Sequence, residues 1–218
     1  MKKSLLILLF CAVAVGISAQ DEKPSDKAFL MFLHGGYCLL PNKTTGLTST
    51  STDYVKKLSS GASWNAQAYF RTKMFIVGLM YSGYTSKGNY IASETSKLTS
   101  SDNILTTYIA PQFGMNIPLA KVFDLGWNGG FGGMLLKNNG TVYGKPRILK
   151  GSAFGVNLGV RGVFNINKYF GISAEVMAIA AQLNKAKVDY HNEVVQVNYV
   201  PSLKLNQLTF SLGLKISI

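Results

Sequence analysis

The chain has 218 residues, of which 47% are hydrophobic and 15% charged, and its 22 basic and 10 acidic side chains give a formal net charge of +12. This composition, with 22 Gly, 6 Pro and 2 Cys, excludes a disordered chain, a collagen-like chain and a disulfide scaffold. The high glycine content and an aromatic content of 11% indicate a β-rich protein.

The N-terminus has the three regions of an export signal. Two lysines precede an apolar run from Leu5 to Val15, and small residues ending at Ala19 follow it. This order predicts a secretory signal peptide over residues 1–19. After its removal Cys38 is the one remaining cysteine, so we expect no intramolecular disulfide and no Cys-based zinc site. We expect Cys38 to be a buried thiol in a strand.

From Lys27 onward the sequence falls into eight segments in which apolar side chains alternate with small or polar ones. The clearest is residues 152–165, where Phe154, Val156 and Leu158 alternate with Gly155, Asn157 and Gly159. A period of two predicts β-strands. The predicted strands span residues 28–39, 62–70, 74–85, 104–117, 122–136, 152–165, 169–181 and 202–218.

The predicted connections alternate in length along the chain. Short ones span residues 71–73, 118–121 and 166–168, and long polar ones span residues 40–61, 86–103, 137–151 and 182–201. Short turns on one rim, long loops on the other, an even number of strands and an export signal are features of outer-membrane barrels. Because lipid cannot pair backbone polar groups, a membrane-spanning sheet must close on itself.

The pattern therefore predicts an all-β fold, an eight-stranded antiparallel up-and-down transmembrane β-barrel with short periplasmic turns and long extracellular loops. The predicted organisation is a signal peptide (1–19), a periplasmic N-terminal segment (20–27) and a single outer-membrane barrel (28–218). Both termini are expected in the periplasm, with no second domain after Ile218.

Aromatic residues at the strand ends are candidates for the two girdles that mark the membrane interfaces. The candidates near the short turns are Phe70, Phe75, Phe123, Phe164 and Phe170. Those toward the long loops are Tyr37, Trp64, Tyr81, Phe131 and Phe154.

Two runs carry a resemblance to a known family. They are Asn165 to Val176 (NINKYFGISAEV) and the closing Leu208 to Ile218 (LTFSLGLKISI). With these runs the chain resembles the small eight-stranded outer-membrane β-barrel proteins of Gram-negative bacteria, of the OmpX and OmpA-barrel type, and most of all the versions common in Bacteroidetes. The resemblance covers nearly all of the mature chain, and it implies fold and location rather than an activity.

The interior of an eight-stranded barrel is just wide enough for its own side chains, so a general diffusion porin is not expected. Arg161 and Glu175 are predicted to point inward from neighbouring strands. A three-residue turn sets Arg161 opposite Ser173, one diagonal step from Glu175. We interpret Arg161 and Glu175 as an interior ion pair, with Asp124 as a third member. The alternative is a gate or relay.

The two histidines, His34 and His191, have no neighbouring carboxylate pair at metal-ligand spacing, so we predict no metal site and no cofactor. Some outer-membrane barrels are lipid A acyltransferases or deacylases that use a His with a Ser. Here His34 is predicted to face the lumen, and the sequence by itself places no Ser beside either histidine. We therefore predict no catalytic residue and keep a lipid A-modifying enzyme as an alternative.

The long connections are basic. The third contains four cations and no acid, and these predict contact with anionic groups such as the phosphates of lipopolysaccharide: Lys137, Lys145, Arg147 and Lys150. Ordinary solvation of exposed loops is the alternative. The first connection carries Lys43, Lys56 and Lys57 against Asp53. Nucleic acid is not an expected partner, because the chain is exported and has no nucleic-acid motif.

The fourth long connection contains a β-prone run, Val194 to Val200, that faces residues 186–190. It predicts a hairpin rising above the membrane. Such a hairpin either offers an edge strand to a protein partner or is a strand extension without a partner.

These observations predict a monomeric, non-catalytic outer-membrane protein with a structural or cell-surface interaction role, in membrane integrity, adhesion or lipopolysaccharide contact. Two alternatives remain from the sequence, a lipid A-modifying enzyme and a soluble exported barrel that binds a small apolar ligand.

Overall fold

The computed structural model describes residues 27–41, 52–93, 98–190 and 193–218. The predicted signal peptide, residues 20–26, Lys43 and His191 lie outside the described residues. The strands are β1 (Lys27–Leu39), β2 (Ser60–Thr72), β3 (Phe75–Ser93), β4 (Leu98–Ala120), β5 (Phe123–Val142), β6 (Lys145–Asn165), β7 (Phe170–Tyr190), β8 (Glu193–Lys204) and β9 (Gln207–Ser217), and one short helix, α2 (Thr52–Leu58), precedes β2.

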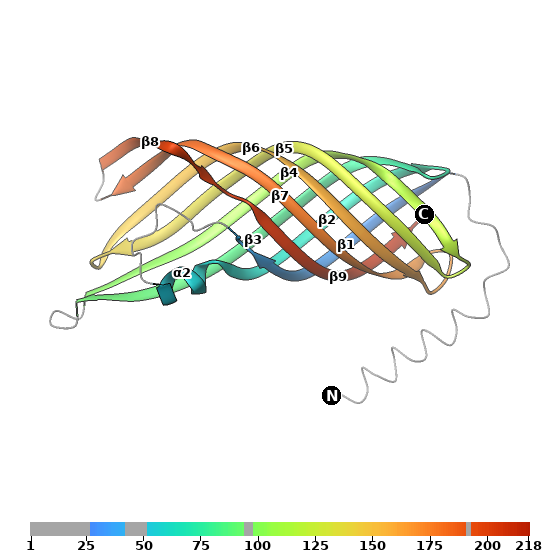
Figure 1. The fold of residues 1–218 in the computed structure, drawn as a ribbon, viewed down its shortest axis with the longest axis horizontal. Helices are drawn as coiled ribbons and strands as arrows, with labels where there is room; N and C mark the ends of the chain where they lie inside the picture. Colours follow the sequence, from blue (N-terminus) through green and yellow to red (C-terminus); the bar gives the residue numbers. More distant parts are fainter. Residues whose placement is uncertain (1–26, 42–51, 94–97, 191–192) are drawn as a thin grey trace, which may run out of the picture.

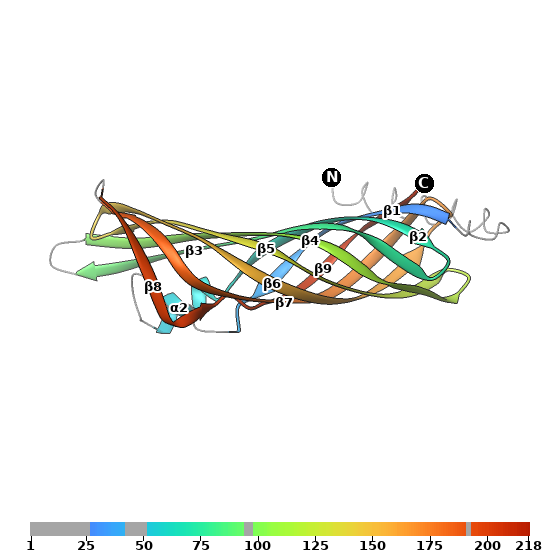
Figure 2. The same cartoon turned by 90° about the horizontal axis from the view of Figure 1, so that it is seen from above.

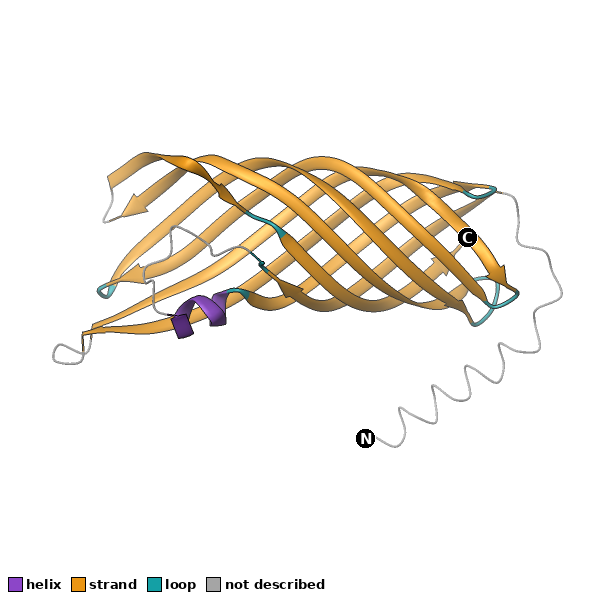
Figure 3. Cartoon of the chain, in the orientation of Figure 1, coloured by secondary structure: helices purple, strands orange, loops and turns teal. Residues whose placement is uncertain are grey.

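The strands close into a ring of antiparallel pairs (Figures 1 and 3). The order runs from β6 through β5, β4, β3, β2, β1 and β9 to β7, and the pairing of β7 with β6 completes it. β1 and β9, the first and last strands of the chain, lie in register from Leu30–Ser217 to Leu39–Leu208. The predicted eight-stranded up-and-down barrel is confirmed. Because every wall strand has two partners there, its backbone groups are paired as lipid requires.

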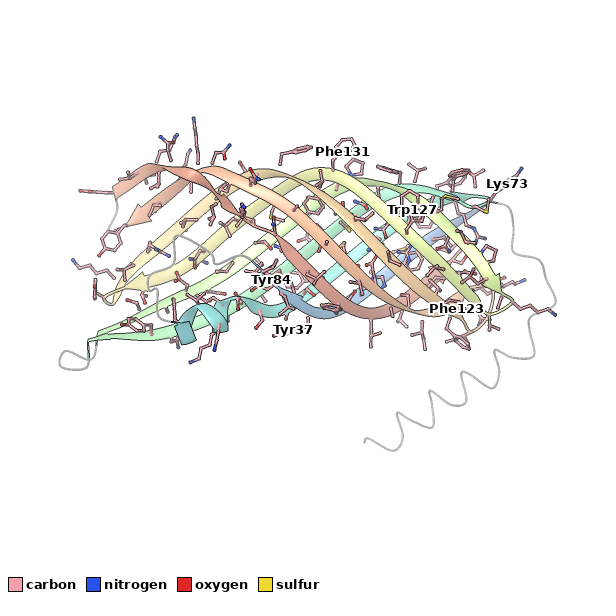
Figure 4. The ribbon with its side chains drawn as sticks, viewed as in Figure 1. Tyr37, Lys73, Tyr84, Phe123, Trp127 and Phe131 are labelled. Atoms are coloured by element: carbon pink, nitrogen blue, oxygen red, sulfur yellow. The ribbon has the colours of Figure 1, made fainter. Side chains whose placement is uncertain are left out.

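The two faces of the wall are inverted relative to a soluble protein. On β6, Phe154 and Leu158 stand outside with 67% and 60% of their surface exposed, whereas Asn157 and Arg161 on the same strand are buried in the lumen. All the predicted girdle aromatics are exposed. Figure 4 shows one of them, Phe131, projecting from the outline of the barrel. An outer face of exposed apolar side chains suits a wall surrounded by lipid and argues against a soluble barrel, whose outer face is polar.

Among the described residues, no helix is long and apolar enough to cross a bilayer.

The two ends of the barrel differ. At one end, which we call the short-turn end, tight turns join β2 to β3, β4 to β5 and β6 to β7, and the C-terminus lies there as well (Figure 1). At the other, the extended end, strands project well beyond the ring, as the side view in Figure 2 shows. The long connections predicted at residues 86–103 and 137–151 are therefore wrong as loops, whereas the hairpin predicted within residues 182–201 is confirmed. Backbone pairing continues through most of each, as far as Ile91–Thr99, Val142–Lys145 and Tyr190–Glu193.

Two further elements differ from the prediction. Residues 202–218 form no single strand, because Leu205 and Asn206 lie outside the regular strands and separate β8 from β9. The connection at 40–61 contains α2, which packs against β3 and β2. The hydroxyl of Tyr84 on β3 donates to the backbone oxygen of Leu58 at 2.9 Å and holds the end of this helix. A helix of seven residues depends on such tertiary contacts, and the pattern of the sequence does not reveal them.

The turn between β5 and β6 provides a test of local backbone geometry. Tyr143 and Gly144 have φ values of 50° and 78°, and positive φ at both positions is the type I′ geometry that Asn-Gly prefers. Replacing Tyr143 by Asn should raise the free energy of unfolding by about 0.5–1 kcal/mol. The measurement is a urea titration of the refolded protein in detergent. Tyr169→Asn, at a turn residue without positive φ, is the control and should bring no gain.

Candidate functional site

The centre of the lumen holds a polar network that joins opposite walls of the barrel. We call it the lumen network, and its members are Phe32, His34, Asn65, Gln67, Tyr69, Arg161, Ser173 and Glu175. Arg161 on β6 donates from Nη1 to Oε1 of Gln67 on β2 at 2.7 Å. β2 and β6 are four positions apart in the eight-membered ring, so this hydrogen bond spans the lumen.

The charge of Arg161 is balanced within the network. Its Nη1 lies 3.8 Å from Oε1 of Glu175, and both side chains are fully buried. The guanidinium Cζ lies 3.5 Å from the centroid of the Phe32 ring, which is cation–π geometry. Gln67 donates from Nε2 to the Glu175 carboxylate at 2.8 Å, and Asn65 donates to it from Nδ2 at 3.2 Å. A buried ion pair needs such supporting contacts to offset its desolvation.

His34 connects two sides of the network. Its Nδ1 lies 2.8 Å from Oδ1 of Asn65, and its Nε2 lies 2.8 Å from Oγ of Ser173. Glu175 Oε2 lies 3.7 Å from the same Nδ1. Ser, His and a carboxylate thus come together, as they do in acyl-transfer enzymes, but all three side chains are buried in the lumen.

The predicted register at this site is wrong by two residues. Arg161 lies directly opposite Glu175, and Ser173 is opposite Val163. The reason is the connection between the paired residues Asn165 and Gly171, which has five residues (166–170) rather than the predicted three (166–168). Asn167 stabilises the longer turn, because its Oδ1 accepts from the backbone N–H groups of Tyr169 and Phe170 at 2.8 Å.

Asp124 belongs to a separate cluster at the short-turn end. Its Oδ2 lies 3.7 Å from Nζ of Lys215 and accepts from Nδ2 of Asn165 at 3.0 Å. Lys215 in turn donates to Oδ1 of Asn165 at 2.6 Å. The structure therefore brings Arg161 and Glu175 together and gives Asp124 a different cation.

A second hydrogen bond spans the lumen nearer the extended end. Gln207 on β9 donates from Nε2 to Oγ1 of Thr106 on β4 at 2.7 Å, and these strands are also four positions apart in the ring. Around it lies an apolar cluster that includes Met80, Tyr84, Met134, Met177 and Leu183, each fully buried. Both polar contacts and apolar side chains therefore occupy the lumen.

The extended end is held by one buried carboxylate, Asp102 on β4. Oδ2 accepts from the hydroxyl of Tyr54 on α2 at 2.6 Å. Oδ1 accepts from Nδ2 of Asn138 on β5 at 2.8 Å and from Nη2 of Arg147 on β6 at 2.6 Å. One side chain therefore joins the helix to three strands.

The four predicted anion-contacting residues have different surroundings. Arg147 is paired with Asp102 and only 13% of its side chain is exposed. Lys137, Lys145 and Lys150 are exposed. Lys145 lies next to the β5–β6 turn, and Lys137 and Lys150 are directly opposite each other on the outer face. The carboxylate that pairs with Arg147 belongs to Asp102 on β4. Because Asp102 lies outside residues 137–151, the sequence of that segment does not indicate that Arg147 is paired.

Sequence reasoning missed Asn65, Gln67 and Ser173 as members of the lumen network, and Asp102 at the extended end. The alternation already places Asn65 and Gln67 on an inward face, because Trp64 and Phe70 occupy the outward one. What alternation does not reveal is which inward residues meet across the ring. In the part of the chain that the structure describes, no group of three or more His, Cys, Asp or Glu side chains is arranged to hold a metal ion.

No family model matches the sequence, and a comparison with curated proteins finds no match. Solved structures do match over most of the chain. A major outer membrane protein from Thermus thermophilus has a TM-score of 0.59 and 10% identity, and the match covers 88% of this chain and 99% of that one. OprG from Pseudomonas aeruginosa has a TM-score of 0.49 and 13% identity, and the match covers 88% of this chain and 97% of that one. Neisserial surface protein A has a TM-score of 0.47 and 12% identity, and the match covers 89% of this chain and 99% of that one. The closed eight-stranded ring and the match to the Thermus thermophilus protein show that the chain has the fold of the small outer-membrane β-barrel proteins.

Proposed function

We propose that this protein is a non-conducting, non-catalytic outer-membrane barrel with a structural and cell-surface interaction role. The observation that carries the proposal is that hydrogen bonds join opposite walls across the lumen, Arg161 to Gln67 and Gln207 to Thr106. An interior occupied in this way leaves no room for diffusion of solutes. In this proposal the signal peptide over residues 1–19 directs export, the short-turn end and both termini face the periplasm, and the extended end faces outward.

The proposed partners follow from the extended end. The exposed lysines of β5 and β6, Lys137, Lys145 and Lys150, suit the phosphates of lipopolysaccharide. β8 suits an extended peptide, because among the described strands it is hydrogen-bonded on one side only, by β7. Val194 and Val195 on this edge are 67% and 56% exposed, and a partner strand could cover them while pairing with the free backbone groups.

The conductance of single molecules in a planar lipid bilayer tests the proposal. The folded full-length protein should give no sustained current steps under conditions in which a general porin gives them. Stable open-channel steps would contradict the filled-lumen proposal. The same preparation should show the gel-mobility difference between unheated and boiled samples that closed barrels give, so that a silent bilayer is not mistaken for unfolded protein.

A lipid A-modifying enzyme is the second candidate, and one observation favours it, the 2.8 Å contact between His34 Nε2 and Ser173 Oγ. Burial of both residues argues against it, because a lipid substrate needs access to the serine. Lipid A from a deletion strain decides between the candidates. An unchanged acylation pattern supports the interaction role. A pattern that changes on deletion, and is restored by the wild-type gene but not by a Ser173→Ala gene, supports the enzyme.

A further inference from the structure

Three lysines form one row on the outer face at the extended end. Lys137 on β5 is directly opposite Lys150 on β6, and Lys150 is directly opposite Lys187 on β7. All three are exposed. Directly opposite residues on one face have Cβ atoms about 5 Å apart, so the three side chains start within about 10 Å of one another. We call these three residues the lysine row.

Lys187 belongs to this row only because of an irregularity in β7. Leu183 points into the lumen, and strict alternation would turn Lys187 inward as well. The register between β6 and β7 shifts between Gly151 and Phe154, where residues 152–153 of β6 face residues 183–185 of β7, one residue more. Beyond the shift Ala186 is the buried residue and Lys187 stands outside. A bulge of this kind re-aims the side chains that follow it.

The row has no counter-charge of its own. In the described part of the chain, no carboxylate lies within 4 Å of any of these three ammonium groups. At the ends of the row Leu105 is opposite Lys137 and Gln196 is opposite Lys187. The nearest acid along the strand is Asp189, two residues beyond Lys187. Like charges directly opposite one another destabilise a sheet unless an anion lies between them.

The row lies where the apolar surface of the barrel ends. Leu135, 56% exposed, precedes Lys137 by two residues on the same face. Phe154, 67% exposed, follows Lys150 by four, and its ring centroid is 6.3 Å from that of Phe131. From Phe154 to Phe164 the outward face of β6 is apolar over ten residues, which at a tilt of roughly 40° covers about 25 Å, the height of the lipid-facing band. The ammonium groups therefore lie just beyond the acyl chains, at the level of lipid headgroups.

We propose that Lys137, Lys150 and Lys187 together bind a phosphate group of lipid A in the outer leaflet. The proposal rests on the proposed function for the orientation of the barrel and for the lipopolysaccharide contact, and names the site. Three ammonium groups converge on one phosphate through charge-assisted hydrogen bonds, while the acyl chains of the same molecule lie on Leu135, Phe131 and Phe154. Lys145 and Arg147, also predicted for this role, lie outside the site.

Binding of fluorescently labelled, bis-phosphorylated lipid A to the folded full-length protein in neutral detergent micelles tests this directly. Replacing all three lysines by Gln should weaken binding at least tenfold. Replacing Lys56, Lys57 and Lys87 by Gln removes the same charge from exposed positions on α2 and β3 at the same end, and should change affinity less than twofold. The triple Lys→Arg variant of the row keeps the charge and should retain binding. If the lysine-row variant and the control variant lose affinity for lipid A equally, the proposal is overturned.

The chemical source of the phosphate is tested with the wild-type protein. Dephosphorylated lipid A should bind at least tenfold more weakly than the bis-phosphorylated form, and inorganic phosphate at millimolar concentration should displace less than half of the lipid. Equal binding of the dephosphorylated lipid, or full displacement by inorganic phosphate, would overturn the assignment to lipid A.

The unfolding temperature tests the same site independently of the binding assay. In neutral detergent without anionic lipid, Lys150→Gln should raise the unfolding temperature by about 2 °C, because Lys150 faces a like charge on both sides. With bis-phosphorylated lipid A present, the same variant should unfold at a lower temperature than the wild type. If Lys150→Gln changes the unfolding temperature in the same direction with and without lipid A, the proposal is overturned. Neither readout depends on conductance or on lipid A chemistry in cells, so a failure here is distinguishable from a failure of the proposed function.

Discussion

Replacing Glu175 by Ala should lower the free energy of unfolding by about 3–5 kcal/mol, because it leaves the fully buried guanidinium of Arg161 without its counter-charge. The variant also removes the acceptor of hydrogen bonds from Asn65 and Gln67. A urea titration in detergent, followed by the gel-mobility shift of the folded barrel, measures the loss. Glu193→Ala removes an exposed carboxylate on β8 and should change stability by less than about 0.5 kcal/mol.

The double variant Arg161→Met/Glu175→Leu separates the ion pair from simple packing. Removing both charges together should recover most of the stability lost in Glu175→Ala, since an apolar pair of similar size often replaces a buried ion pair without loss. If Glu175→Ala loses no more than Glu193→Ala, the lumen network does not depend on this ion pair.

Replacing Asp102 by Ala should release helix α2 and loosen the extended end while the membrane-spanning ring stays closed. The substitution leaves the donors of Tyr54, Asn138 and Arg147 without this acceptor, at a cost of about 3 kcal/mol. Tryptic cleavage after Lys56 and Lys57 should become roughly 100-fold faster, because cleavage follows the population of the locally open form.

The control for this variant is Asp189→Ala, which removes an exposed carboxylate at the same end and should leave the cleavage rate within twofold of the wild type. The gel-mobility shift of the barrel should be the same in all three proteins. A loss of that shift in Asp102→Ala would mean that the carboxylate supports the whole barrel, and unchanged cleavage would mean that α2 is held by other contacts.

The sequence alone determined the wall of this barrel. A period of two separates outward Phe154, Val156 and Leu158 from inward Asn157 and Arg161, and the preference of lipid for apolar side chains leaves only one orientation of the sheet. The number of wall strands, the short turns and the exposed aromatic girdles follow from the same pattern. These features are local, and each is repeated in every strand, so an error in one segment does not remove the signal.

Only the tertiary structure decided which residues meet. A period of two is the same for any register shifted by two residues, which is why Arg161 was predicted opposite Ser173 and lies opposite Glu175. The five-residue connection at residues 166–170 sets that register. The contact of Gln67 with Arg161 joins positions 94 residues apart and exists because the ring closes.

The extended end was also beyond the sequence pattern. Polar segments such as residues 137–151 have the composition of loops, yet they pair as strands because neighbouring hairpins support them and Asp102 joins them to α2. The extra residue that β7 carries between Gln182 and Ala186 reverses the side chains that follow and brings Lys187 beside Lys150. Alternation predicts the face of a residue only while pairing is regular, and the residues proposed to bind phosphate lie where a bulge interrupts it.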